Sequence, residues 1–158
     1  MRPLRLFALD EEDLALVSAH LQDAIGRVGD MAFLPKERRF AVIFNRFDWA
    51  GVDADDGNGT GRSRARSYER RRTALHFERV LRAQVRGLPR TDKDALVNLL
   101  AIRFEPSDPP AGMIELVCSG DAAIRLDVEC VEARMSDLGP AWATQARPDH
   151  HLDEDEAG

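Results

Sequence analysis

The sequence predicts a single α+β domain built around one antiparallel sheet of about six or seven strands. Several segments alternate between apolar and polar residues, as in residues 124–130, which is the pattern of strands that bury one face. Turn signals separate these segments, so the strands are expected to follow one another in hairpin order. Apolar residues spaced three and four apart after Asp10 predict one long helix. The sheet should hold this helix on one face and either stay open or curl into a partial barrel or roll.

The first elements are an opening strand over residues 4–9 and the long helix. Asp10 is a good N-cap residue, and the acids that follow it suit the positive end of a helix dipole. Gly29 or Asp30 is expected to end the helix. Its apolar stripe consists of Leu14, Val17, Leu21, Ile25 and Val28.

A hairpin comes next, because residues 31–34 and 40–44 are apolar and flank a turn that contains Pro35. Residues 75–85 read as one long strand whose alternation breaks at Arg79 and Val80, where a β-bulge would restore it.

The second half of the chain begins with a single helical turn, which Thr91 and Asp94 would cap, followed by a strand over residues 99–104. Residues 114–118 and 122–130 form a second predicted hairpin around a turn at 119–121. Residues 132–138 are expected to form a short closing helix, stopped by Gly139 and Pro140.

Composition sets the domain limits. Residues 1–143 are predicted to form the domain, with a flexible loop at about 50–69, and residues 144–158 an acidic, disordered tail. Much of the net charge of −6 comes from this tail, so no overall positive field favours nucleic acid or a membrane surface. The chain has no apolar run long enough for a membrane span and no secretory signal, which predicts a cytoplasmic protein. Cys118 and Cys130 are expected to be free thiols.

The strongest local anomaly is a cluster of six arginines, opposed within the segment by Glu69 alone. Guanidinium groups bind phosphates through forked donors, so this segment is a candidate for binding a polyanion. The alternative interpretation is a solvated loop whose charges offset nearby acids. The six residues are Arg62, Arg64, Arg66, Arg70, Arg71 and Arg72.

No motif predicts a catalytic group, a metal site or a cofactor. His76 and Glu78 project from one strand face and could orient a general base, but a solvated sheet face often carries such a pair. His150 and His151 lie in the acidic tail, where two adjacent ligands cannot provide the closed geometry of a structural zinc site.

Several segments together resemble an alphaproteobacterial family known as domain of unknown function 2948. The resemblance runs from about residue 4 to residue 150 and implies a small cytoplasmic bacterial protein, with no activity, cofactor or catalytic residue to carry over. The segments that carry it are residues 9–14, 18–24, 33–40, 45–49, 75–80, 99–104 and 124–130.

The leading functional hypothesis is a non-enzymatic binding or adaptor module that recognises a protein partner or a second copy of itself. Two alternatives stay open: a small-molecule enzyme whose site is assembled from distant residues, and an RNA-associated protein that uses the segment from Arg62 to Arg72. The polar sheet face proposed for contact carries Asn45, Arg46, Asp48, Trp49, His76 and Glu78.

Overall fold

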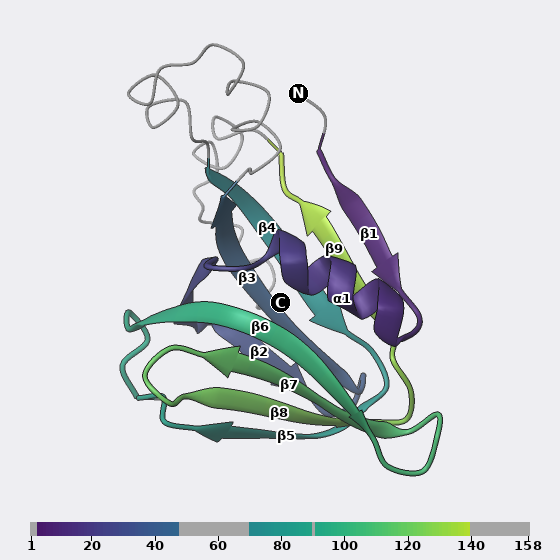
Figure 1. Ribbon diagram of the computed structural model, residues 1–158. Coiled ribbons are helices and arrows are strands. Elements are labelled where there is room, and N and C mark those ends of the chain that lie inside the picture. Colours follow the sequence, from purple (N-terminus) through teal and green to yellow (C-terminus); the bar gives the residue numbers. More distant parts are fainter. Residues whose placement is uncertain (1–2, 48–69, 90, 140–158) are drawn as a thin grey trace.

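The computed structural model describes residues 3–47, 70–89 and 91–139, which contain nine strands and one helix (Figure 1). All neighbouring strands are antiparallel, and their order in the sheet is β1-β9-β4-β3-β2-β6-β7-β8-β5. The predicted single antiparallel sheet is confirmed, but it has more strands than expected and the fold is mostly β. The elements are β1 (Arg5–Ala8), α1 (Glu11–His20), β2 (Ile25–Leu34), β3 (Arg39–Phe47), β4 (Arg70–Phe77), β5 (Val80–Arg86), β6 (Leu96–Pro106), β7 (Gly112–Cys118), β8 (Ala123–Val128) and β9 (Ala133–Asp137).

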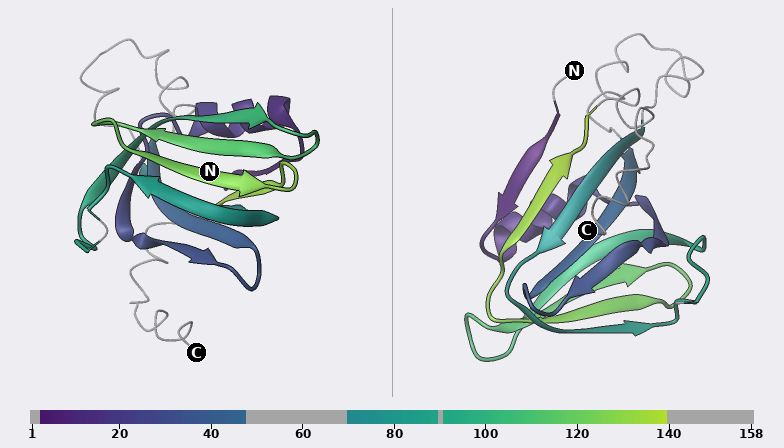
Figure 2. Two further views of the ribbon diagram at one scale, coloured as in Figure 1. Left: turned by 90° about the horizontal axis from the view of Figure 1, so that it is seen from below. Right: turned by 180° about the vertical axis from the view of Figure 1, so that it is seen from behind.

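The sheet is strongly bent at β2, which belongs to both of its halves. Residues 25–27 of β2 pair with β6, whereas residues 31–34 pair only with β3, and the register shifts between Gly26 and Met31. The half containing β1, β9, β4 and β3 therefore crosses the half containing β6, β7, β8 and β5 (Figures 1 and 2). The edge strands β1 and β5 do not pair, so the sheet forms an open roll.

The hydrophobic core lies between the two halves. Large side chains from both halves, such as Phe44, Phe77, Leu99 and Leu116, are fully buried there. Helix α1 lies along one side of this interior, where it contacts β6 and β1 (Figure 1). The Ser18 hydroxyl accepts a hydrogen bond of 2.9 Å from the Ile102 backbone N–H, which links the helix to β6.

Helix α1 is shorter than predicted. Asp10 caps it as expected, since its carboxylate accepts a 2.8 Å hydrogen bond from the Asp13 backbone N–H. The prediction that the helix continues to Val28 is wrong. Asp23 has a positive φ of 66°, and its N–H donates to the Leu99 carbonyl at 2.8 Å, so the chain turns out of the helix and joins β6. Glycine at positions 26 and 29 further disfavours a helix over this stretch.

The predicted long strand over residues 75–85 is two strands that lie in different halves of the sheet. β4 is surrounded by β3 and β9, whereas β5 forms the far edge beside β8. Arg79 has a positive φ of 61°, and the Val80 N–H donates to the Arg38 carbonyl at 2.8 Å. The break in alternation at Arg79 and Val80 thus marks a crossover between halves, and a β-bulge or similar irregularity follows directly, because the register with β8 shifts between Val80 and Arg82.

The helix predicted over residues 132–138 is strand β9, which lies between β1 and β4 and is hydrogen-bonded to both. No helical turn forms at Thr91–Asp94. The Asp92 carboxylate instead accepts a 3.2 Å hydrogen bond from the Asp94 N–H in an irregular turn.

The other local predictions hold: the opening strand, the β2–β3 hairpin and the β7–β8 hairpin are all present, and both cysteines are free thiols. The loop at 50–69 and the tail at 144–158 lie outside the described residues.

A buried ion pair joins the middle of the sheet to the start of the chain. The Arg46 guanidinium donates two hydrogen bonds to Asp137, of 3.0 and 2.8 Å, and both side chains are at most 5% exposed. The Thr73 hydroxyl and the Leu4 backbone N–H donate to the same carboxylate at 2.7 and 2.8 Å. Since these residues belong to β3, β4, β9 and the segment before β1, a single carboxylate holds four parts of the chain together.

We predict that Asp137→Asn destabilises the protein by about 3–5 kcal/mol, because it leaves the buried Arg46 charge without its partner. Urea denaturation measures the effect. Asp94→Asn is the matched control: its 3.9 Å contact with Arg27 is largely exposed, so the loss should be within ~1 kcal/mol. Equal losses in the two variants would contradict the central role of this pair.

The same carboxylate should make stability depend on pH. Burial alone would raise the pKa of Asp137, but the hydrogen bonds from Arg46, Leu4 and Thr73, together with the Arg46 charge, hold that pKa below its usual value. A lowered pKa in the folded state stabilises the protein above the pKa of the unfolded state, roughly 3.9, and this contribution is lost as the pH falls below it. The stability difference between wild type and Asp137→Asn should therefore be constant near neutral pH and shrink on acidification.

Candidate functional site

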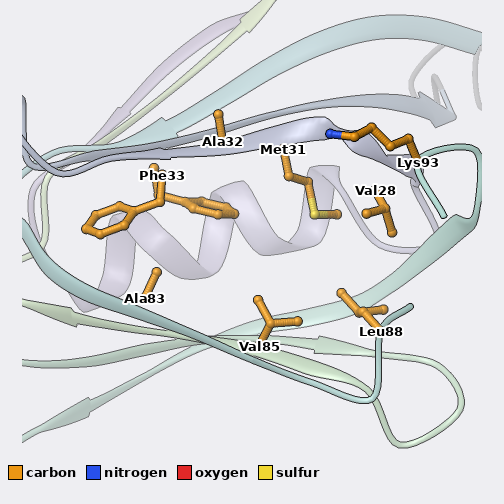
Figure 3. A pocket seen from close by; sticks show the side chains of 9 residues that line it. Val28, Met31, Ala32, Phe33, Ala83, Val85, Leu88 and Lys93 are labelled. Carbon is orange, nitrogen blue, oxygen red and sulfur yellow. The ribbon is translucent and has the colours of Figure 1, made fainter. Parts of the chain in front are cut away.

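An apolar groove of about 340 Å³ lies between β2 and β5. In Figure 3, Met31 and Phe33 from β2 point across it toward Ala83 and Val85 from β5. The two strands approach here without pairing: residues 31–34 of β2 pair with β3, and β5 pairs with β8. The complete lining is Val28, Met31, Ala32, Phe33, Phe40, Ala83, Val85, Leu88 and Lys93.

Strand alternation explains why the β5 side of the groove is apolar. Ala83 and Val85 are half-buried and face inward, while the intervening Arg82, Gln84 and Arg86 are exposed. Because none of the described strands bridges β2 and β5, the inward side chains of β5 are covered only partly. The result is an open slot along the interior of the roll, between the edge strand β5 and the part of β2 that pairs only with β3.

Lys93 is the one charged residue among the nine that line the groove. Its backbone is held against β2, since the Gly29 N–H donates to the Lys93 carbonyl at 2.9 Å. A Cβ atom at position 29 would lie 3.0 Å from both the Lys93 Cβ and its carbonyl oxygen, so this close approach depends on glycine. The lysine side chain extends along the β2 side of the groove (Figure 3).

The residues predicted for contact lie elsewhere. Asn45 and His76 are on the outer face of β3 and β4, and Glu78, directly after β4, contacts His76 there; none of them lines the groove. Arg46, which was predicted on the same face, points to the opposite one, because adjacent strand residues alternate, and its guanidinium is buried against Asp137. Asp48 and Trp49 lie outside the described residues.

The pair of His76 and Glu78 is joined by a third residue that the sequence did not reveal. The His76 Nδ1 atom lies 2.7 Å from a Glu78 carboxylate oxygen, and the Arg39 Nε atom donates to the same oxygen at 2.9 Å. Burial raises the pKa of Glu78, but the hydrogen bonds from His76 and Arg39 outweigh it and lower the pKa. The carboxylate is therefore held ionised in a partly exposed cluster, as expected for a solvated sheet face.

The arginine cluster is divided by the structure. Arg62, Arg64 and Arg66 lie outside the described residues, and the other three begin β4. Arg70 pairs in register with Phe47 and Arg72 with Asn45, so both face outward, whereas Arg71 pairs with Arg46 on the inner face.

Sequence reasoning missed the groove because its two walls are far apart in the chain. Helical spacing predicts Val28 in a helix, and strand alternation predicts Ala83 and Val85 on the apolar side of a strand continuous with residue 75. The sequence pattern correctly predicts that these apolar side chains face inward, but no local pattern indicates that β2 and β5 face each other.

Neither a metal site nor a membrane-spanning helix finds support in the described part of the chain. No three His, Cys, Asp or Glu side chains gather there as metal ligands would. None of its helices combines the length and the apolar composition needed to cross a membrane.

Comparison with known proteins identifies a family but no individual relative. The model of the family described as "Protein of unknown function (DUF2948)" matches residues 4–150. Since this match covers most of the chain, the protein belongs to that family. No curated protein and no solved structure matches the chain significantly.

We predict that Gly29→Ala destabilises the protein by about 1–3 kcal/mol, because the new methyl group would displace the Lys93 backbone. Chemical denaturation measures the change, and the backbone resonance of Lys93 should shift. Asp30→Ala places the same residue at the next, exposed position of β2 and should change stability by less than ~0.5 kcal/mol. If both variants behave alike, the close approach does not position Lys93.

Proposed function

We propose that this member of the family is a non-enzymatic binding module that holds a small, elongated apolar molecule with an anionic end. The observation that carries the proposal is the groove between β2 and β5, with eight uncharged residues and one lysine along its length. Ligand sites in proteins are typically concave and mostly apolar, with a few polar groups that orient the ligand.

The size and lining of the groove support an alkyl carboxylate. At about 340 Å³ it is near the lower limit of small-molecule sites, which suits a short alkyl chain better than a large ring system. Each methylene moved from water into such surroundings contributes about 0.8 kcal/mol. The Lys93 ammonium, a compact positive charge, would then pair with the carboxylate at the open side.

The lining favours binding over catalysis. It contains no histidine, cysteine, serine or acid that could act as a nucleophile or general base, and its lysine is exposed. The His76–Glu78 pair lies on the opposite face of the sheet, so an enzyme built on it would use a different site. We also propose the cytoplasm of a bacterial cell as the location, which the family resemblance and the sequence imply.

A protein partner or a second copy of the chain is the other occupant to consider within this class. The facing edges of β2 and β5 have no strand partner in the described residues, so an extended segment could pair there. A single inserted strand would, however, have to run antiparallel to one wall and parallel to the other. The start of β5 lies near the end of β2, because the Val80 N–H donates to the carbonyl of Arg38, just beyond β2. Leu88, just after β5, lines the groove together with Val28, near the start of β2. β2 and β5 therefore run in opposite directions.

The test is a titration of isotope-labelled protein with decanoate, monitored by NMR. We expect chemical-shift changes at Val28, Met31, Phe33 and Val85, and weaker binding of decyltrimethylammonium, which has the same chain length but a positive end. Lys93→Gln should weaken decanoate binding about twofold to fivefold, the effect of an exposed ion pair. Lys36→Gln, at an exposed turn lysine outside the groove, is the control and should bind as wild type.

Val85→Glu provides an independent check, since a carboxylate in the slot would repel the ligand and remove the apolar surface. This variant should abolish binding while the protein stays folded. The absence of decanoate binding in the wild type, or shift changes that avoid the groove, would overturn the proposal. Binding that Lys93→Gln and Lys36→Gln reduce equally would remove the role of Lys93.

A further inference from the structure

A second hollow, of about 420 Å³, lies on the outer side of the same irregular part of β2. Its polar side chains come from β2, β3 and β4, and none of them lines the apolar groove. They are Arg27, Asp30, Asn45, Arg70 and Arg72.

The hollow concentrates positive charge in a protein whose net charge is −6. Three guanidinium groups line it, and Asp30 is the one acid among its lining residues. Strand pairing brings these residues together: Arg72 pairs with Asn45, Asn45 pairs with Ile25, and Arg27 follows two residues later on the same face of β2. Arg70 lies two residues before Arg72 and so shares its face of β4.

The arginines are arranged so that they can bind a ligand. The Arg70 guanidinium stacks 4.6 Å from the centre of the Phe47 ring, which orients the group and leaves its N–H edge for other partners. Arg27 has only a 3.9 Å contact with Asp94, both side chains being largely exposed, so little energy holds it there. Asn45 adds a neutral amide that can donate.

We propose that this hollow binds the phosphate group of a small phosphorylated molecule. A phosphate offers several oxygens that can each accept from a guanidinium fork, so three arginines around one hollow match it better than they match a carboxylate. The hollow is bounded by four strands of one sheet, β2, β3, β4 and β6, which fits a compact ligand. This site is separate from the groove and does not depend on the proposed alkyl carboxylate.

The experiment compares phenyl phosphate with benzoate, which share a ring and differ in the anion, by NMR titration of the full-length protein. We expect phenyl phosphate to shift Asn45, Arg70 and Arg72 and to bind at least fivefold more tightly than benzoate. Inorganic phosphate should compete with it. Arg72→Gln should weaken binding about tenfold, and Arg72→Lys, which keeps the charge but loses the fork, should fall between.

Arg103→Gln is the matched control, because Arg103 is an exposed arginine on β6 that does not line the hollow, and this variant should bind phenyl phosphate as wild type does. A uridine oligonucleotide is the third probe and should bind no more tightly per phosphate than phenyl phosphate. Three results would each overturn the proposal: no phosphate binding, equal losses in Arg72→Gln and Arg103→Gln, or oligonucleotide binding without phenyl phosphate binding. The last would point to a polymeric ligand.

Discussion

The register break in β2 is the constraint on which the shape of the molecule depends. Before the break, β2 pairs with both β3 and β6; after it, β2 follows β3 alone while β6 turns away. A strand that kept both partners would continue a regular sheet, and the two halves would not cross as they do. Because residues 27–30 leave the ladder with β3, one side of β2 opens into the apolar groove and the other into the basic hollow.

The two hollows differ in chemistry because they lie on opposite faces of one strand. Met31 and Phe33 turn toward the interior of the roll, where the core excludes water, whereas Arg27 and Asp30 remain at the outer surface. The ion pair of Arg46 and Asp137 stabilises the wall behind this region, since it fixes β3 relative to β9. β3 in turn pairs with β2 on both sides of the register break, so both sites are supported by the same strand.

Local sequence signals predicted the antiparallel sheet, both hairpins and the Asp10 cap, because turns and alternation act over a few residues. They failed where long-range pairing decides the outcome. Leu21, Ile25 and Val28 have helical spacing, yet the bonds between residues 23–24 and Leu99 draw this stretch into the sheet. Arg46 looked like one more polar residue of a strand end; its partner Asp137 is 91 positions away. Lys93 and the walls of the groove were missed for the same reason.

The position of β9 has a consequence for how the chain acquires its structure during synthesis. Among the nine strands that the structure describes, β1 is synthesised first, and its only strand partner in that part of the chain is β9, which ends at Asp137. At roughly 5–20 residues per second, β1 must wait several seconds for its neighbour to be translated. Until then the strand edge of β1 lacks the partner with which it pairs in the folded protein, and Leu4 and Leu6, which pack against the core in the folded protein, lack the cover that β9 provides. Of the described strands, β1 is thus made first but gains its strand partner only when the last of them, β9, has been made.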